Sequence, residues 1–299
     1  MLNKEKPVKV IVDKEKCTKC GYCLRTCENY LAPDLDGYPI ARKVEESLLG
    51  CIQCGRCMMK CPTEAIEIIG EDIDKNHLRT MPEKIADYES LNGLMLKRRS
   101  IRRFKPDEVS KDDIDKIINT AATAPVGIPP SEVKVLVFQG RKKVQEFAQD
   151  LCNEIKHSKK VMTPFALNLM KPFIGEGQYK VMKDFALPLC DVTLSERENG
   201  NDVLFYDAPA VVVFYGTELT DVEDMIIAAT NATIAAESLN LGTCFIGTVS
   251  YFLNKSQKLK EKYGILKGEK VATAFVLGYP NEGHFRTFQR NFKEVKIIN

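Results

Sequence analysis

Two runs of four cysteines with identical spacing constrain this chain more than any other feature of its sequence. Eight of its eleven cysteines belong to these runs: Cys17, Cys20, Cys23 and Cys27, then Cys51, Cys54, Cys57 and Cys61. Both runs read C-x2-C-x2-C-x3-C, and each cysteine of the second lies 34 positions after its counterpart (51 − 17 = 34; 61 − 27 = 34). Two-residue gaps let consecutive thiolates turn toward a common centre, so the repeat predicts two iron–sulfur sites.

Two other uses of clustered cysteines compete with this interpretation. A disulfide framework needs an oxidising compartment, and the N-terminal residues MLNKEKPVKVIVDKEK lack the apolar stretch of a secretory signal. Zinc sites usually combine two C-x2-C pairs, often with histidine, rather than two runs of four cysteines. The pattern therefore favours clusters, and we expect the N-terminal part of the chain to carry single electrons.

Residues 1–70 resemble the bacterial ferredoxins that carry two [4Fe–4S] clusters, in which the fourth cysteine of each run ligates the other cluster. The resemblance implies one cluster on Cys17, Cys20, Cys23 and Cys61, and a second on Cys51, Cys54, Cys57 and Cys27. Gly21 and Gly55 follow the second cysteine of each run, where the backbone passes close to inorganic sulfide. The chain departs from the family at Glu28, where proline is common.

Chain length and net charge indicate the broad class of protein. With 299 residues, two domains are expected, because single cores rarely grow beyond roughly 250–300 residues. We expect a cluster domain over residues 1–75, a polar linker over 76–90 and a second domain over 91–299. The net charge of +2 does not indicate a nucleic-acid partner, and no apolar run reaches the length of a membrane span. A cytoplasmic protein is expected.

Helices and strands alternate in the remaining residues. A helix is predicted over residues 88–99, and another starts at a capping box formed by Ser110 and Asp113. Apolar, β-branched segments predict buried strands, and these segments are residues 133–138, 210–215 and 271–277. The alternation indicates an α+β or α/β domain.

Two further segments of the second domain have distinctive compositions. A capping box at Thr220 and Glu223 predicts the start of an alanine-rich helix that runs to about Asn240 and stops near Gly242. Residues 159–200 contain several prolines and glycines and match no clear pattern. Long irregular inserts are often lids or binding loops, so this insert is interpreted as one of these.

Residues 97–103 read Lys-Arg-Arg-Ser-Ile-Arg-Arg, with five cations in seven positions. Cations are favourable at a helix C-terminus, and basic runs are usually solvated. A phosphate site, in contrast, needs two or three cations and a hydroxyl around one anion. Arg98, Ser100 and Arg102 alternate, so an extended segment would direct all three to one side. A nucleic-acid surface is disfavoured because no aromatic residues interleave, but the spacing leaves the other two interpretations open.

Residues 98–104, Arg-Arg-Ser-Ile-Arg-Arg-Phe, resemble the opening motif of the nitroreductase family of FMN-binding flavoproteins. Further segments follow in the family's order: AATAPVGIPP at 121–130, Asp-Ala-Pro-Ala at 207–210, LNLGTCFIG at 239–247, and Gly-Tyr-Pro at 278–280. The resemblance covers about residues 90–299. It implies an α+β fold with a mixed sheet flanked by helices, and a homodimer with FMN at the subunit interface.

The same resemblance implies roles for individual residues. The FMN phosphate and ribityl chain would be held by Arg98, Arg99, Ser100 and Arg102, with Arg286 and Arg290 closing on the phosphate. The isoalloxazine ring would be lined by Gly127, Ile128 and Pro129, and it would meet backbone groups of Ile246 and Gly247. The loop at 126–133 lacks the family's usual serine, asparagine and Gln-Pro-Trp, so backbone groups are expected to replace side-chain hydrogen bonds there.

Together the two resemblances imply an FMN-dependent oxidoreductase of the nitroreductase type. Two [4Fe–4S] clusters would pass electrons to the flavin, which would reduce a small organic acceptor such as a nitroaromatic, a quinone or an activated alkene. Reduced ferredoxin or NAD(P)H would be the donor, and no side chain is predicted to act as an acid or base. The alternatives are a specialised relative, such as a reductive dehalogenase, and a carrier module that docks to a larger redox complex. A lid at 159–200 would favour the enzyme, and an exposed apolar patch there would favour the carrier.

Overall fold

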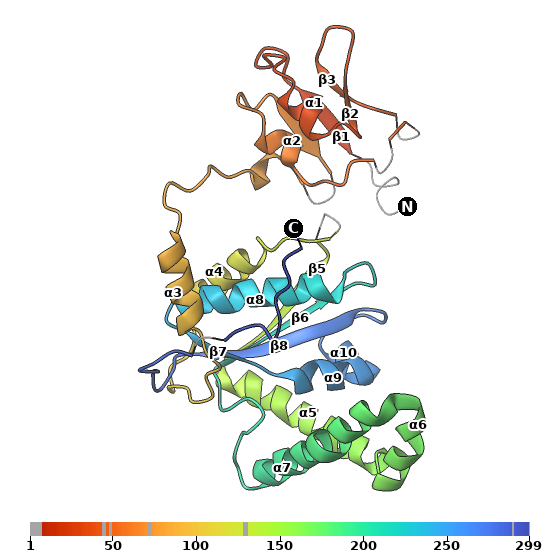
Figure 1. Ribbon diagram of the computed structural model, residues 1–299, viewed down its shortest axis with the longest axis vertical. Helices are drawn as coiled ribbons and strands as arrows, with labels where there is room; N and C mark the ends of the chain where they lie inside the picture. Colours follow the sequence, from red (N-terminus) through yellow and green to blue (C-terminus); the bar gives the residue numbers. More distant parts are fainter. Residues whose placement is uncertain are drawn as a thin grey trace. The chain divides into compact units, whose positions relative to one another are not determined.

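The computed structural model describes residues 8–43, 46–47, 50–70, 73–127, 131–288 and 290–298. The chain divides into two compact units (Figure 1). Unit 1 comprises Met1–Ile85 and Val126–Glu132, and unit 2 comprises Ala86–Pro125 and Val133–Asn299. Among the helices that the structure describes, none combines the length and apolar character needed to cross a membrane.

Unit 1 contains two pairs of short antiparallel strands. Strand β1 (Lys9–Val12) pairs with β4 (Ile66–Ile69), and β2 (Leu31–Pro33) pairs with β3 (Pro39–Ala41). Two short helices, α1 (Tyr22–Thr26) and α2 (Arg56–Met59), contact each other, and each contains the third cysteine of one run. A 3-10 turn, η2 (Lys75–His77), follows. The core is small, with apolar strand residues packed against buried cysteines.

Unit 2 is built around a four-stranded sheet in the order β5-β6-β8-β7. The strands are β5 (Val133–Gln139), β6 (Ala210–Gly216), β7 (Gly242–Phe245) and β8 (Lys270–Gly278), and each neighbouring pair is antiparallel. One parallel pairing is added at the β7 edge, where Ser100 forms an isolated β-bridge with Thr243. The α+β prediction is confirmed, and the three predicted strands are present as β5, β6 and β8.

Alternating side chains of β6 build two cores, one on each face of the sheet. Ala210, Val212 and Phe214 pack with the helices α4 (Lys111–Ala121) and α8 (Val222–Ser238). Val211 and Val213 pack with α5 (Arg141–Val161) and α9 (Gly247–Lys255), near α10 (Gln257–Lys262) (Figure 1). Because both faces are covered, β6 is apolar throughout rather than alternating between apolar and polar residues.

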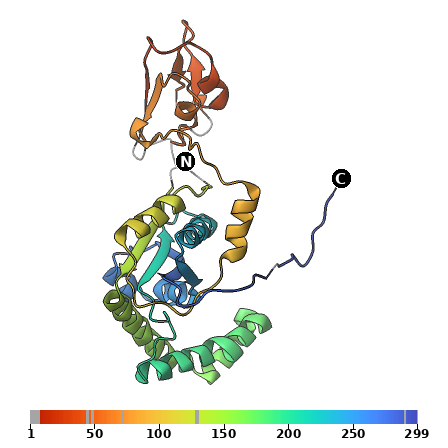
Figure 2. The same ribbon diagram turned by 90° about the vertical axis from the view of Figure 1, so that its left-hand side faces the viewer.

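The helix α3 (Tyr88–Lys97) packs against α8 (Figure 2). It begins at Asp87, whose carboxylate accepts a hydrogen bond from the backbone N–H of Ser90 (2.8 Å). It ends at Lys97, and the backbone becomes extended at the C-cap residue Arg98 (φ −58°, ψ 124°). This places the basic run directly after α3, at the β7 edge of the sheet.

The two predicted capping boxes have different outcomes. Ser110 caps α4 as predicted, because its hydroxyl accepts the N–H of Asp113 (3.0 Å). The prediction at Thr220 was wrong, since Asp221 is the N-cap residue of α8. The buried side chain of Thr220 instead lies beside Gly216, where an added Cβ would approach it to 2.9 Å. Within the described part of the chain, the Thr220 hydroxyl has no hydrogen-bond partner.

The segment from 159 to 200 is helical, so the prediction of an irregular insert was wrong. It contains the end of α5, then α6 (Pro164–Val181), a π-helical turn (Met182–Ala186) and α7 (Leu187–Glu198). Pro164 occupies the first position of α6, after the capping residue Thr163, where a missing N–H costs no helical hydrogen bond. Gly175, with φ 78°, forms a kink within α6. In α6, therefore, a proline lies at the helix start and a glycine at the kink, and the segment still forms a helix.

Candidate functional site

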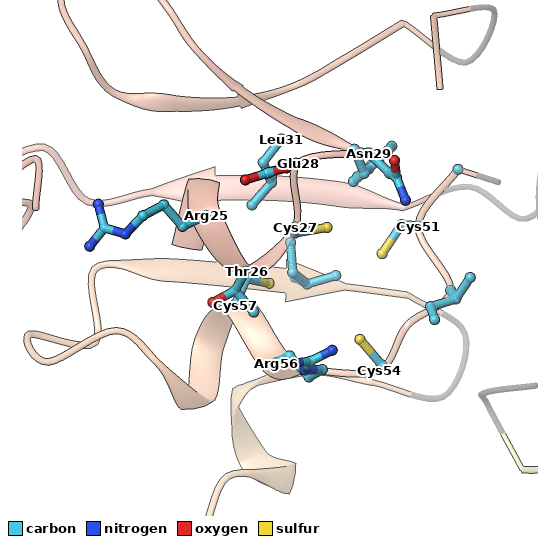
Figure 3. A pocket seen from close by; sticks show the side chains of 15 residues that line it. Arg25, Thr26, Cys27, Glu28, Asn29, Leu31, Cys51, Cys54, Arg56 and Cys57 are labelled. Carbon is cyan, nitrogen blue, oxygen red and sulfur yellow. The ribbon is translucent and has the colours of Figure 1, made fainter. Parts of the chain in front are cut away.

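The eight cysteines of the two runs line two separate cavities in unit 1. The first, of about 370 Å³, is lined by Cys27, Cys51, Cys54 and Cys57, together with Arg25 and Arg56 (Figure 3). The second is lined by Cys17, Cys20, Cys23 and Cys61. Each cavity thus takes three cysteines from one run and the fourth from the other.

The backbone around each cavity turns at the same two positions of the repeat. Gly21 and Gly55 have φ of 72° and 69°, and each is the N-cap residue of the following short helix. Lys19 and Gln53 have φ of 53° and 55° and are also 34 positions apart (53 − 19 = 34). The sequence indicated the glycines but not Lys19 or Gln53, because residues with a Cβ seldom adopt this conformation.

Burial disfavours free thiolates at several of these cysteines. It raises the pKa of Cys57 to about 12, and it also raises the pKa values of Cys23, Cys27 and Cys51. Burial acts in the same direction at Cys61, but there it is outweighed by hydrogen bonds from backbone N–H groups. One of these comes from Ala65 (3.1 Å), and the pKa of Cys61 is lowered.

The four cysteine sulfurs around each cavity fit a cofactor whose positive charge stabilises several thiolates at once. Cluster irons are held by four cysteine thiolates, and cation binding replaces the thiol protons. The gathering of four sulfurs around each cavity therefore suits iron–sulfur clusters. In the part of the chain that the structure describes, no three His, Cys, Asp or Glu side chains are placed to hold a single metal ion.

In unit 2, the basic run lies along the free edge of β7. The N–H of Ile101 donates to the carbonyl of Thr243 (2.9 Å), and Ser100 bridges to the same residue. Ile101 is buried, whereas Ser100 and Arg102 on either side are exposed and Arg98 is half-buried. Across residues 100–102 the alternation expected of an extended segment is present, so Ser100 and Arg102 are directed away from the core.

Strand β7 leads directly into the next pair of predicted site residues. Ile246 is buried and is the N-cap residue of α9, and Gly247 is the exposed first residue of that helix. Because the first N–H groups of a helix have no partner within it, this end of α9 can bind an electronegative group. The backbone of β7 therefore links Ser100, Arg102, Ile246 and Gly247 in one region of unit 2.

The C-terminal segment is attached to the same basic run through Arg99. Its guanidinium donates to the hydroxyl of Thr287 and to the carbonyl of Phe288 (2.9 Å), and the Thr287 hydroxyl donates to the carbonyl of Leu96 (2.6 Å). Arg286 and Arg290 are exposed in this segment. Arg99 thus anchors the segment that carries them, a role that its position in the basic run did not indicate.

The predicted flavin-ring loop is only partly described. Gly127 is exposed in a bend after α4 and belongs to the stretch Val126–Glu132, which groups with unit 1. Ile128 and Pro129 lie outside the described residues.

Gly242 has a packing role that sequence reasoning misassigned. The predicted helix stop was wrong, because α8 ends at Ser238 and Gly242 is the first residue of β7. A Cβ at position 242 would lie 2.6 Å from Cγ1 of Ile101. Gly242 therefore lets the basic run approach the strand.

We expect Gly242→Ala to destabilise unit 2 by about 1–3 kcal/mol, because the added methyl overpacks the buried contact with Ile101. Gly93→Ala is the matched control, since a Cβ at this exposed position of α3 meets no atom within 4 Å. It should be neutral or stabilising. Chemical unfolding of both variants measures the difference, and equal unfolding free energies would contradict the close-packing role of Gly242.

Comparisons with known proteins agree with this architecture. Residues 95–279 match the model of the nitroreductase family, and residues 16–66 match that of the 4Fe-4S dicluster domain. The fold is similar to that of a nitroreductase with bound FMN from Bacteroides fragilis NCTC 9343, with a TM-score of 0.51 and 18% identity over 70% of this chain and 98% of the other. For a nitroreductase with bound FMN from Desulfitobacterium hafniense DCB-2, the TM-score is 0.52 and the identity is 16%, over 70% of this chain and 98% of the other. No curated protein sequence matches.

Proposed function

The chain belongs to the nitroreductase family and carries a 4Fe–4S dicluster domain, and on that premise we propose an FMN-dependent oxidoreductase fed by two [4Fe–4S] clusters. The observation that carries the proposal is the presence, in one chain, of two four-cysteine cavities and an exposed arginine–serine segment along β7. The proposed acceptor is a small organic molecule, namely a nitroaromatic, a quinone or an activated alkene. The proposed donor is reduced ferredoxin or NAD(P)H.

The cysteines of each cavity are the proposed ligands of one cluster. Cys17, Cys20, Cys23 and Cys61 would hold one, and Cys27, Cys51, Cys54 and Cys57 would hold the other. When bound, the clusters supply one-electron transfer and FMN supplies two-electron chemistry toward an organic acceptor. The protein's own contribution is to bind and orient these groups and to set their environment.

The FMN site is proposed around β7. Arg98, Ser100 and Arg102 would bind the phosphate, because two guanidinium groups and a hydroxyl suit a dianion. Ile246 and Gly247 would present backbone groups at the start of α9. Arg286 and Arg290 would reach the phosphate from the segment that Arg99 anchors to the basic run. Gly127, Ile128 and Pro129 remain the proposed lining of the ring.

We further propose a homodimer formed through α3 and α8. Tyr88, Leu91 and Met95 are exposed at helical spacing on α3, and Val222 and Ile226 are exposed on α8, against which α3 packs. An apolar surface shared by two packed helices suits a self-complementary interface.

Leu91→Glu is expected to shift the protein from dimer to monomer, because it places a charge in this apolar surface. Leu266→Glu is the control, since Leu266 is also an exposed leucine of unit 2 but lies outside α3 and α8. Sedimentation or light scattering gives the mass of each variant. A wild-type monomer, or a Leu91→Glu variant that remains a dimer, would contradict this interface.

One observation favours a second candidate, a carrier module that passes electrons to a larger complex. Apolar side chains are exposed at intervals of three or four residues in two runs, one from the last residue of α5 into α6 and one from the end of α6 into α7. They are Val161, Phe165, Leu169 and Phe173, then Val181, Phe185, Leu189 and Val192. Exposed apolar surfaces of this kind often mark interaction sites.

The two candidates differ in their behaviour toward small acceptors. Purified, cluster-loaded protein should contain FMN, and anaerobic mixing with NADH, NADPH or reduced ferredoxin should reduce that flavin with at least one donor. Repeated turnover with a nitroaromatic or a quinone supports the enzyme. Reducible flavin that no small acceptor reoxidises supports the carrier, and cluster-loaded protein that holds no flavin refutes the FMN-dependent enzyme.

A further inference from the structure

Two consecutive residues before β6 have an uncommon backbone conformation. Tyr206 and Asp207 have φ of 57° and 52°, although neither is glycine. Side chains with a Cβ disfavour this region, so such residues persist where surrounding contacts fix them. Strained positions of this kind concentrate at functional sites.

A buried carboxylate fixes the turn. Asp202 is 7% exposed, and its Oδ1 accepts the N–H groups of Leu204 (3.1 Å) and Phe205 (2.9 Å). Its Oδ2 accepts the N–H of Asp207 (3.3 Å). Phe205 is fully buried and stacks on Phe147, with ring centroids 5.4 Å apart. The residues on both sides of Tyr206 are therefore held in place.

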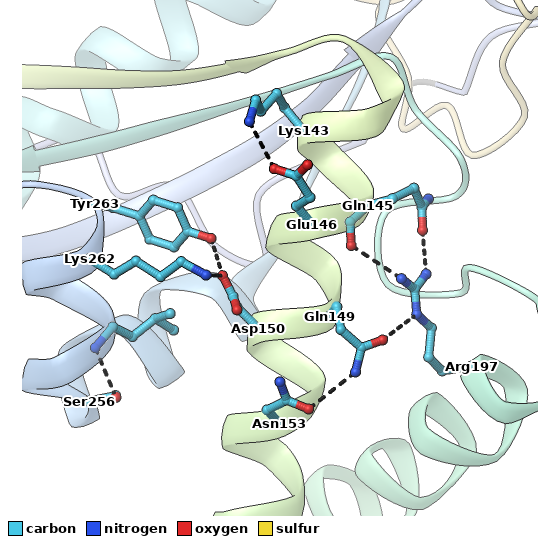
Figure 4. Close-up of polar contacts among 11 residues, drawn as sticks. Lys143, Gln145, Glu146, Gln149, Asp150, Asn153, Arg197, Ser256, Lys262 and Tyr263 are labelled. Carbon is cyan, nitrogen blue, oxygen red and sulfur yellow. Dashed lines mark hydrogen bonds and ion pairs between the residues drawn. The ribbon is translucent and has the colours of Figure 1, made fainter.

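Two helices support this arrangement from outside the turn. Gln145 on α5 donates from Nε2 to the Oδ2 of Asp202 (2.8 Å). Figure 4 shows Arg197 of α7 bonded to the same Gln145 and to Gln149. Arg141, the first residue of α5, donates to the carbonyl of Asp207. The conformation of the turn is thus supported by contacts from α5, and α7 supports these contacts through Gln145.

The turn places Tyr206 beside a residue of the basic run. The guanidinium carbon of Arg102 lies 5.9 Å from the centroid of the Tyr206 ring. The pKa of Arg102 is raised, first by Cys244 on β7 and next by the neighbouring Tyr206. Arg102 is exposed, so without such contacts its long side chain would sample many rotamers. Contacts that restrict it reduce the entropy lost when it binds an anion.

We propose that Tyr206, held by the Asp202 turn, is a positioning residue that orients Arg102 for the phosphate of FMN. This inference rests on the proposed FMN function. It assigns a role to the Asp-Ala-Pro region that precedes β6, because Tyr206 lies immediately before that motif.

The test compares FMN with riboflavin, which lacks the phosphate, as ligands of the flavin-free, cluster-loaded full chain. Tyr206→Phe removes the hydroxyl and keeps the ring. It should weaken FMN binding by roughly two- to tenfold, the effect of losing one polar group beside the Arg102 guanidinium, and leave riboflavin binding unchanged. Tyr263→Phe is the control, because it removes a hydroxyl bonded to Asp150 elsewhere in unit 2. It should leave the ratio of FMN to riboflavin affinity unaltered.

A double-mutant cycle separates positioning from general stability. In the Arg102→Ala background, Tyr206→Phe should cause no further loss of FMN affinity. Additive losses, an unchanged FMN affinity in Tyr206→Phe, or equal weakening of FMN and riboflavin would each overturn the inference while leaving the proposed function intact. Wild-type protein that binds neither flavin would overturn the proposed function, and the inference with it.

Discussion

Replacing Cys61 with serine is expected to abolish the cluster beside the first cysteine run, although Cys61 belongs to the second run. Cys61 lines the same cavity as Cys17, Cys20 and Cys23, and its sulfur accepts a hydrogen bond from the N–H of Ala65. Loss of one thiolate of four removes a ligand that serine replaces poorly, because cluster irons favour thiolate sulfur. Iron and sulfide content should fall by about half if the other cluster remains.

Electron paramagnetic resonance of matched variants identifies which cluster is lost. The spectrum of reduced Cys61→Ser should resemble that of Cys20→Ser, a variant of the first run, and should differ from that of Cys54→Ser, a variant of the second. Cys190→Ser is the control, since Cys190 lies in α7 of unit 2 and lines neither cavity. A Cys61→Ser spectrum that matches Cys54→Ser would contradict the crossed arrangement.

Arg98→Ala and Arg102→Ala are each expected to weaken FMN retention strongly. A hydrogen bond to a charged group contributes about 1.5–3 kcal/mol, which corresponds to a dissociation constant raised roughly ten- to hundredfold. Arg103→Ala is a close control, because Arg103 belongs to the same basic run but its exposed guanidinium pairs with Glu282 (3.0 Å). Titration of each flavin-free protein with FMN measures the affinities of the wild type and the three variants. Equal values in the wild type and in the Arg98 and Arg102 variants would refute the phosphate assignment.

Features set by local chemistry were predictable from the sequence. The cysteine repeat indicated the N-terminal unit because ligand spacing is local. Ser110 indicated the start of α4 because an N-cap bonds within its own turn. The strand β6 was predictable because a strand covered on both faces is apolar along its whole length.

Features that depend on distant contacts were not predictable in this way. A glycine after a predicted helix indicates a helix stop, which is how Gly242 was interpreted. The need for glycine at this position comes instead from its contact with Ile101, 141 positions earlier (242 − 101 = 141). Arg99 bonds to residues near the C-terminus, and Tyr206 meets Arg102 through a turn held by α5 and α7. The helices after α5 were missed for a different reason, because a segment with several prolines and glycines matched no clear pattern, although Pro164 occupies a helix start.

The central claim is that the clusters deliver electrons to the flavin of the same chain. The most direct measurement is anaerobic stopped-flow reduction of bound FMN by reduced ferredoxin, in the wild type and in the Cys61→Ser and Cys54→Ser variants at equal FMN occupancy. We predict rapid flavin reduction in the wild type and a large loss of rate in at least one cluster variant. Equal rates of flavin reduction in all three proteins would contradict the claim.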